Sequence, residues 1–190
     1  VELRLTEDGE TRKLVFSGDI GNTNQPLISD PLTIDDADYL VIESTYGNRL
    51  HEKPGDTVAE LATVLQRAFD RGGSVIVPAF AVGRTQELIY QFNMFYEHHP
   101  EYADLLGNVN VYIDSPMATT ATEVFKKNAQ VFDEETKNYI LSGDHPLDFP
   151  NLKFTRNTAD SQMLNVDKHP KIIISASGMC EAGRIRHHLK

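Results

Sequence analysis

Cysteine is almost absent from this sequence of 190 residues, in which Cys180 is the single example. One thiol cannot form an intrachain disulfide or supply a zinc site built from several cysteines, and we interpret it as a small, half-buried apolar residue. The chain has no apolar run of transmembrane length and no signal-peptide pattern, so we expect a cytoplasmic protein without a membrane partner. Gly-x-Gly-x-x-Gly and P-loop sequences are also missing, which argues against a plain α/β nucleotide-binding domain.

Positive charge is scarce as well. The chain has 28 acidic residues against 18 Lys and Arg, a formal net charge of −10. This balance excludes a generally basic surface that coats nucleic acid, although it permits a local cationic groove. The length fits one domain, or one domain with a piece of another. Because the chain opens on Val1 and stops within a helical pattern at Lys190, we expect a fragment of a longer protein.

The first fifty residues contain two apolar segments that each end in an acid. Residues 1–5 alternate apolar and polar side chains, an Asp-Gly pair then turns the chain, and residues 13–16 return, which predicts a β-hairpin. Its second strand continues to Asp19, which is set between two glycines. Residues 39–42 form a second apolar run that ends at Glu43. Two strand ends carrying carboxylates are expected where strands converge on one site, although an ordinary turn aspartate has the same local pattern.

Strand, polar loop and helix alternate along the rest of the chain, and α/β is the fold class that this order predicts. Helices are predicted over residues 57–69, 85–95, 119–127 and 132–141, with a brief turn at 161–164 and a helix starting at 182; strands are predicted over 74–78, 110–113, 152–154 and 171–175.

Arg84 stands at the start of one of these helices, within Gly83-Arg84-Thr85-Gln86-Glu87. A guanidinium beside the backbone N–H groups of a helix start has the character of a phosphate clamp. The alternative is a helix-capping turn with a surface arginine. The local sequence leaves both interpretations open.

Five short motifs occur in order along the chain: Ser17-Gly18-Asp19, Glu43-Ser44-Thr45-Tyr46-Gly47, Pro78-Ala79-Phe80-Ala81-Val82-Gly83-Arg84, Asp114-Ser115-Pro116-Met117-Ala118 and Ser175-Ala176-Ser177-Gly178-Met179. Together they resemble the β-CASP branch of the metallo-β-lactamase superfamily, and within it the RNA-processing nucleases: the cleavage-and-polyadenylation endonuclease and its bacterial and archaeal relatives. The resemblance implies a β-CASP cap, with a mostly parallel sheet flanked by helices, inserted into a metallo-β-lactamase αββα domain. Residues 1–45 would belong to the αββα domain and residues 46–190 to a cap truncated at its C-terminal end.

The resemblance also implies roles for the two acids. Asp19 corresponds to the carboxylate that bridges two zinc ions, and Glu43 to an acid that orients a metal-bound histidine; both count as catalytic residues. Two divalent cations that lie close together need an anion between them, as a bridging carboxylate provides. A histidine that binds a metal usually donates its other ring N–H to a carboxylate, which fits the role of Glu43.

Five further residues match positions that face the substrate cleft in the family. Arg84 would hold a substrate phosphate, whereas Ser115, Ser177 and Gly178 would contact the nucleotide. Arg184 is a weaker candidate for phosphate binding. Contacts of this kind position a strand without reading its sequence.

The histidines depart from the family pattern. The signature His-x-His-x-Asp-His is absent, and the seven histidines show no zinc-ligand spacing. His98-His99 is interpreted as a helix end and His187-His188 as helix surface. His51 follows the Glu43 loop, and a position near the cleft is the less favoured interpretation for it. We therefore expect two zinc ions in the parent protein and weak or no zinc binding by this chain, which by itself would be catalytically inactive.

The predicted parent is a zinc-dependent ribonuclease that hydrolyses phosphodiester bonds of RNA, with single-stranded RNA bound between the two domains. Its predicted partners are RNA and the rest of the metallo-β-lactamase domain, and a homodimer is a further option. Two alternatives stay open: a non-catalytic β-CASP homologue that acts as an RNA-binding or scaffold subunit, and a DNA-repair nuclease of the same superfamily. The sequence does not distinguish endonuclease from exonuclease action.

Overall fold

A computed structural model describes residues 1–50 and 57–190, so His51 lies outside the described residues. The first of its two sheets has the strand order β1 (Glu2–Glu7), β2 (Glu10–Phe16), β3 (Tyr39–Val41). Strands β1 and β2 are antiparallel, and β3 pairs in parallel with β2. Asp8 and Gly9 at the tip have φ angles of 51° and 81°, as a tight hairpin turn needs. The predicted hairpin is confirmed.

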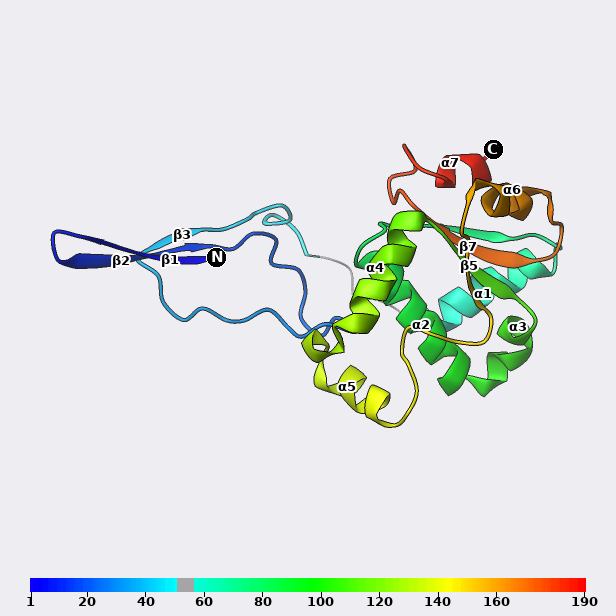
Figure 1. Ribbon diagram of the computed structural model, residues 1–190, viewed down its shortest axis with the longest axis horizontal. Coiled ribbons are helices and arrows are strands. Elements are labelled where there is room, and N and C mark those ends of the chain that lie inside the picture. The colour runs from blue at the N-terminus through cyan, green and yellow to red at the C-terminus, as the bar shows by residue number, and fades with distance from the viewer. Residues whose placement is uncertain (51–56) are drawn as a thin grey trace.

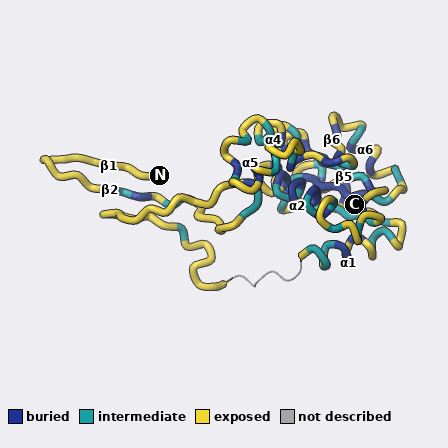
Figure 2. The backbone as a smooth tube through the Cα atoms, turned by 90° about the horizontal axis from the view of Figure 1, so that it is seen from below, coloured by how far each residue is buried: buried dark blue, intermediate teal, exposed yellow. Residues whose placement is uncertain are grey.

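This three-stranded sheet projects from one side of the molecule and is largely exposed (Figures 1 and 2). Within its three strands, Lys13 and Val15 are the buried residues. The ammonium of Lys13 lies 2.8 Å from Asp36, and its backbone N–H donates to the Asp38 carboxylate at 2.7 Å. These bonds tie the sheet to the following loop, but no layer of the described chain covers either face of the sheet.

The second sheet has four parallel strands in the order β4-β7-β5-β6. Their bounds are β4 Val75–Pro78, β5 Asn110–Asp114, β6 Leu152–Phe154 and β7 Lys171–Ser175. Because all four run in one direction, their carboxyl ends lie at the same edge. The α/β class with a parallel sheet is therefore confirmed.

The helices are α1 Thr57–Phe69, α2 Arg84–His98, α3 Ala103–Gly107, α4 Pro116–Lys127, α5 Glu134–Leu141, α6 Thr158–Val166 and α7 Ile185–His188. Most predicted helices are present, with shifted ends. Helix α4 begins earlier than predicted because the Ser115 hydroxyl accepts the Ala118 N–H and Pro116 takes the first helical position. The turn predicted at 161–164 is a full helix, α3 was not predicted, and α7 is shorter than expected. Among the described residues, no helix is both long and apolar enough to span a bilayer.

Strand β7 is buried along its whole length and separates two layers of helices. Ile172 and Ile174 belong to the large core, which also contains the buried side chains of α1, α2 and α3. Ile173 points to the opposite face by the two-residue period of a strand. That face is covered by α6 and α7 (Figure 1). Since Leu164 and Ile185 are buried outside the large core, a smaller core lies on this side.

Candidate functional site

The two predicted acids lie together at the carboxyl ends of β2 and β3. Glu43 accepts the Ile20 N–H at 2.6 Å and the Thr45 hydroxyl at 2.8 Å. The Glu43 N–H in turn donates to the Ser17 hydroxyl at 3.0 Å. These bonds fix the loop that carries Asp19, whose side chain is exposed. The parallel pairing of β2 with β3 thus places both motifs at one edge, as predicted.

The environment of Glu43 favours its charged form. The hydrogen bond from the Ile20 N–H, followed by that from Thr45, lowers the pKa of Glu43, although burial opposes the shift. Both oxygens of this carboxylate are used: Oε1 accepts from Ile20 and Oε2 from Thr45. Glu43 therefore acts in this chain as the residue that shapes the Asp19 loop.

A second group of predicted residues surrounds a cavity at the carboxyl edge of the parallel sheet. The cavity has a volume of about 480 Å³. Its walls come from the loop after β4, from the β5–α4 junction and from the loop after β7; they include Phe80, Ala81, Ser115, Met117, Ser177 and Arg184. Strands β5 and β7 are neighbours, yet α4 and α7 leave toward opposite faces of the sheet (Figure 1). Such a divergence opens a crevice where ligands bind in open α/β sheets.

Gln86 holds the loops around this cavity in place. It is fully buried; its amide nitrogen donates to the backbone oxygens of Ala81 and Ala118 and to the Thr122 hydroxyl at 3.0–3.3 Å. Its oxygen accepts the Gly83 N–H at 2.8 Å. One side chain thus connects the loop after β4 to α4. Sequence reasoning did not identify this role, because a glutamine on a helix gives no local sign of burial.

Arg84 begins α2 and has 57% of its side chain exposed. One guanidinium nitrogen lies 2.8 Å from Glu87. An exposed pair of this kind contributes at most about 1 kcal/mol, so the guanidinium can exchange this partner for a phosphate. The N–H of Gly83 is used within the turn, and so is that of Thr85, which donates to Phe80 at 3.2 Å. The predicted clamp therefore rests on the arginine more than on these two amides.

The other predicted contacts differ in accessibility. Ser115 is buried and accepts the Ala118 N–H at 3.2 Å, so its hydroxyl already caps α4. Ser177 and Gly178 are half-buried in the loop after β7. The shape of this loop depends on Gly183, whose φ is +76° and whose missing Cβ would lie 2.3 Å from the Ala176 oxygen. A side chain at position 183 would clash with the loop.

Asp114 forms the centre of a buried polar network beneath the cavity. It ends β5, has no exposed surface, and accepts four side-chain hydrogen bonds. The donors are Thr155 and Ser161 at 2.6 Å, His188 Nε2 at 2.6 Å and Arg184 at 2.8 Å. The network links β5, α6 and α7, and it holds the guanidinium of Arg184 against the sheet edge.

The charge of Asp114 is maintained by these donors. Burial alone would raise the pKa of Asp114, but the hydrogen bonds from His188, Ser161, Thr155 and Arg184 outweigh it and hold this pKa well below its ordinary value. The interpretation of His187-His188 as helix surface is half wrong. His187 is exposed, whereas His188 is buried and also contacts Asn165 at 2.7 Å. An aspartate directly after a buried strand was the available signal for this network.

The two groups of predicted residues are separate in this chain. Among residues 1–50 and 57–190, no hydrogen bond or ion pair joins Asp19 or Glu43 to Arg84, Ser115 or the Ser177 loop. The acids follow strands of the three-stranded sheet, whereas the residues that line the cavity follow strands of the parallel sheet. Figure 1 shows the two sheets apart from each other.

Within residues 1–50 and 57–190, the two predicted acids do not by themselves make up the ligand set of a zinc site. A zinc ion takes about four ligands, whereas the acid pair supplies the exposed Asp19 and a Glu43 carboxylate whose oxygens are both engaged. In the described part of the chain, no group of three or more His, Cys, Asp or Glu residues is arranged to hold a metal ion.

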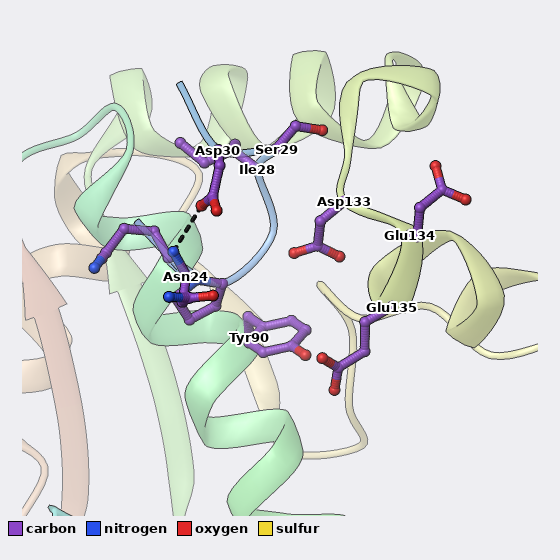
Figure 3. A pocket seen from close by; sticks show the side chains of 10 residues that line it. Asn24, Ile28, Ser29, Asp30, Tyr90, Asp133, Glu134 and Glu135 are labelled. Atoms are coloured by element: carbon purple, nitrogen blue, oxygen red, sulfur yellow. Dashed lines mark hydrogen bonds between the residues drawn. The ribbon is translucent and has the colours of Figure 1, made fainter. Parts of the chain in front are cut away.

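A second cavity, of about 550 Å³, lies between the loop at residues 24–30 and the start of α5 (Figure 3). Asp30, Asp133 and Glu135 surround the Tyr90 ring there. Burial, and then the negative charges of Glu135 and Asp133, raise the pKa of Tyr90. Two of these acids have structural roles: Asp30 accepts the Asn24 N–H at 2.6 Å, and Asp133 caps α5. No predicted site residue lines this cavity, and we place the functional site at the strand ends instead.

Fold and site together define an α/β domain that presents arginines, helix starts and loop backbone at the carboxyl edge of a parallel sheet. Residues 85–190 match the family model described as "Beta-Casp domain". The chain belongs to the β-CASP family. The resemblance inferred from the five motifs is thereby confirmed.

Curated relatives also support membership of this family. The chain is 36% identical over 186 residues to "Ribonuclease TTHA0252" of Thermus thermophilus, an alignment that covers 98% of this chain and 42% of that protein. It is 32% identical over 189 residues to an "RNase J-like protein" of Methanocaldococcus jannaschii, covering 98% and 41%. It is 28% identical over 182 residues to "Endoribonuclease YSH1" of Saccharomyces cerevisiae, covering 94% and 22%. The chain thus spans less than half the length of each of these relatives.

Proposed function

We propose that this chain is the RNA-binding part of a ribonuclease that hydrolyses phosphodiester bonds of single-stranded RNA. The observation that carries the proposal is the cavity at the carboxyl edge of the parallel sheet, which gathers the loops after β4, β5 and β7. Membership of the β-CASP family supports it, as do relatives named as ribonucleases and endoribonucleases.

In this proposal, Arg84 binds a backbone phosphate by exchanging its exposed contact with Glu87 for the phosphate oxygens. Arg184 contributes positive charge at the cavity wall, although its contact with Asp114 offsets part of that charge. The Ser177 hydroxyl and the backbone at Gly178 contact the sugar or phosphate. Ser115 acts through the start of α4, which its hydroxyl caps.

Residues 1–45 are proposed to be part of a metallo-β-lactamase domain, with residues 46–190 as the β-CASP domain. The three-stranded sheet then packs against the rest of the former domain, which would cover apolar side chains that are now exposed. Leu5, Tyr39 and Leu40 are examples, each more than half exposed. We propose that Asp19 gives one carboxylate to a two-zinc centre of the whole protein, which would supply charge neutralisation at the phosphate. Glu43 keeps the Asp19 loop in position.

Binding of RNA by this chain tests the proposal. Arg84→Ala is expected to weaken binding of a single-stranded RNA oligonucleotide and to reduce the salt dependence by about 0.7 in the slope of log K against log salt, the value for one phosphate contact. Fluorescence anisotropy at several salt concentrations measures both quantities. Arg71→Ala is the matched control, because Arg71 carries the same charge and lies four residues before β4 begins, on the amino-end side of that strand. Equal binding by wild type, Arg84→Ala and Arg71→Ala contradicts the phosphate contact.

Hydrolysis is tested in the whole protein. Asp19→Asn is expected to abolish RNA cleavage while RNA still binds, because the residues that line the sheet-edge cavity do not include Asp19. Gel analysis of an end-labelled RNA measures cleavage. Full activity of Asp19→Asn contradicts the catalytic role of this carboxylate.

A further inference from the structure

Large apolar side chains are exposed around the sheet-edge cavity. Phe80 is 56% exposed, and Met117 and Met179 are each 67% exposed. Phe80 and Met117 both line the cavity, where they lie with Arg184. An aromatic ring that stays in water gives up the free energy that burial would contribute, so its exposure at a proposed binding site needs a reason.

The Phe80 ring is held from one side. A Cβ atom built on Gly178 would lie 3.0 Å from Cδ2 and 3.1 Å from Cε2 of this ring, so the bare backbone of Gly178 packs directly against it. The backbone oxygen of Phe80 accepts two hydrogen bonds from Thr85, from the hydroxyl at 2.7 Å and from the N–H at 3.2 Å. Thr85 is itself buried. Phe80 is therefore a fixed ring with a supported side and an open side.

We infer that Phe80, with Met117 beside it, is a stacking platform for an unpaired nucleobase. This inference rests on the proposed function, because it concerns the same site and the same RNA strand. A base carries an apolar face that stacks on an aromatic ring, while its phosphate remains charged. The surroundings fit that combination: Arg84 directly precedes the Thr85 that anchors Phe80, and Arg184 lines the same cavity.

The platform defines the substrate class more closely. Every base has a π face, so stacking on Phe80 accepts all four bases. A base inside a duplex is already stacked on its neighbours, so duplex RNA does not offer that face. The site thus takes single-stranded RNA of any sequence and discriminates against double-stranded RNA.

The test compares two strands of equal length and charge: a single-stranded RNA oligonucleotide, and a sugar–phosphate strand from which the bases have been removed. Wild type is expected to bind the RNA more tightly than the abasic strand. Phe80→Ala should weaken RNA binding by about 5- to 150-fold, the range for the loss of one base–aromatic stack, with no effect on the abasic strand. Phe80→Trp should retain the affinity, and Phe80→Leu should lose most of it because leucine has no π face.

Leu141→Ala is the matched control, since Leu141 is 83% exposed at the end of α5 and is not one of the residues that line the cavity. Thermal melting of each variant verifies that it is folded. Equal weakening of RNA and abasic binding by Phe80→Ala would overturn the inference, and so would duplex RNA that competes as well as single-stranded RNA. Unchanged RNA binding by Phe80→Ala, together with weaker binding by Arg84→Ala, overturns the platform and leaves the proposed function standing. Absence of RNA binding by wild type refutes both.

Discussion

Replacing Asp114 with asparagine tests whether the buried network holds the sheet-edge site together. The amide keeps the shape of the carboxyl group but loses the negative charge, and one of its two polar atoms becomes a donor. That atom then faces donors at 2.6–2.8 Å, where the wild type has an acceptor. His188 has a side chain without exposed surface and Arg184 one that is 20% exposed, so water cannot replace the lost partner fully.

The expected cost follows from the burial of this network. Removing one partner of a buried ion pair costs about 3–5 kcal/mol, and we expect about 3 kcal/mol for Asp114→Asn because one acceptor oxygen remains. For a chain of this length, that is a fall of about 6–12 °C in the melting temperature. Urea unfolding followed by circular dichroism measures the free energy, and thermal melting measures the temperature. Asp104→Asn, a substitution of an exposed aspartate in α3, is the matched control and should melt like the wild type.

The pH dependence separates a charge effect from a packing effect. The folded-state pKa of Asp114 lies below its ordinary value, so its stabilising contribution is complete above about pH 4 and is lost as the pH falls further. The difference in unfolding free energy between wild type and Asp114→Asn should therefore be constant at neutral pH and shrink in acid. A difference below 1 kcal/mol at neutral pH, or one that does not change in acid, would refute the reasoning.

Three further predictions concern local geometry. Glu43→Gln should speed amide hydrogen exchange at Ile20 by several-fold, because a neutral amide oxygen is a weaker acceptor than a carboxylate; unchanged exchange would contradict this. Gly183→Ala should cost at least about 2 kcal/mol in urea unfolding, since the new Cβ would lie 2.3 Å from a backbone oxygen, whereas Gly107→Ala meets nothing within 4 Å and should be neutral or stabilising. The carboxyl of Asp167, whose pKa is lowered to about 2 chiefly by a backbone hydrogen bond, should titrate near that pH in carbon NMR, and a midpoint near 4 would contradict the contact.

Much of the fold followed from local patterns. A two-residue period marked the first strand, short continuous apolar runs marked the strands of the parallel sheet, a helical period marked α1, and the Asp8-Gly9 pair marked the hairpin turn. Helix ends were less predictable, because caps decide them. Ser115 and Asp133 each accept an N–H bond that sets where a helix begins.

The sequence by itself determined the α/β class and the β-CASP resemblance, since these depend on residue order. It predicted that Asp19 and Glu43 meet at one sheet edge, and the parallel pairing of β2 with β3 in the structure brings them there. Tertiary structure alone decided that Asp114 and His188 meet in a buried network, and that a fixed, exposed Phe80 packs on the backbone of Gly178. These contacts join residues roughly 70 to 100 positions apart in the chain. No local pattern specifies such a contact, because it exists only once the strand order β4-β7-β5-β6 has brought the loops together.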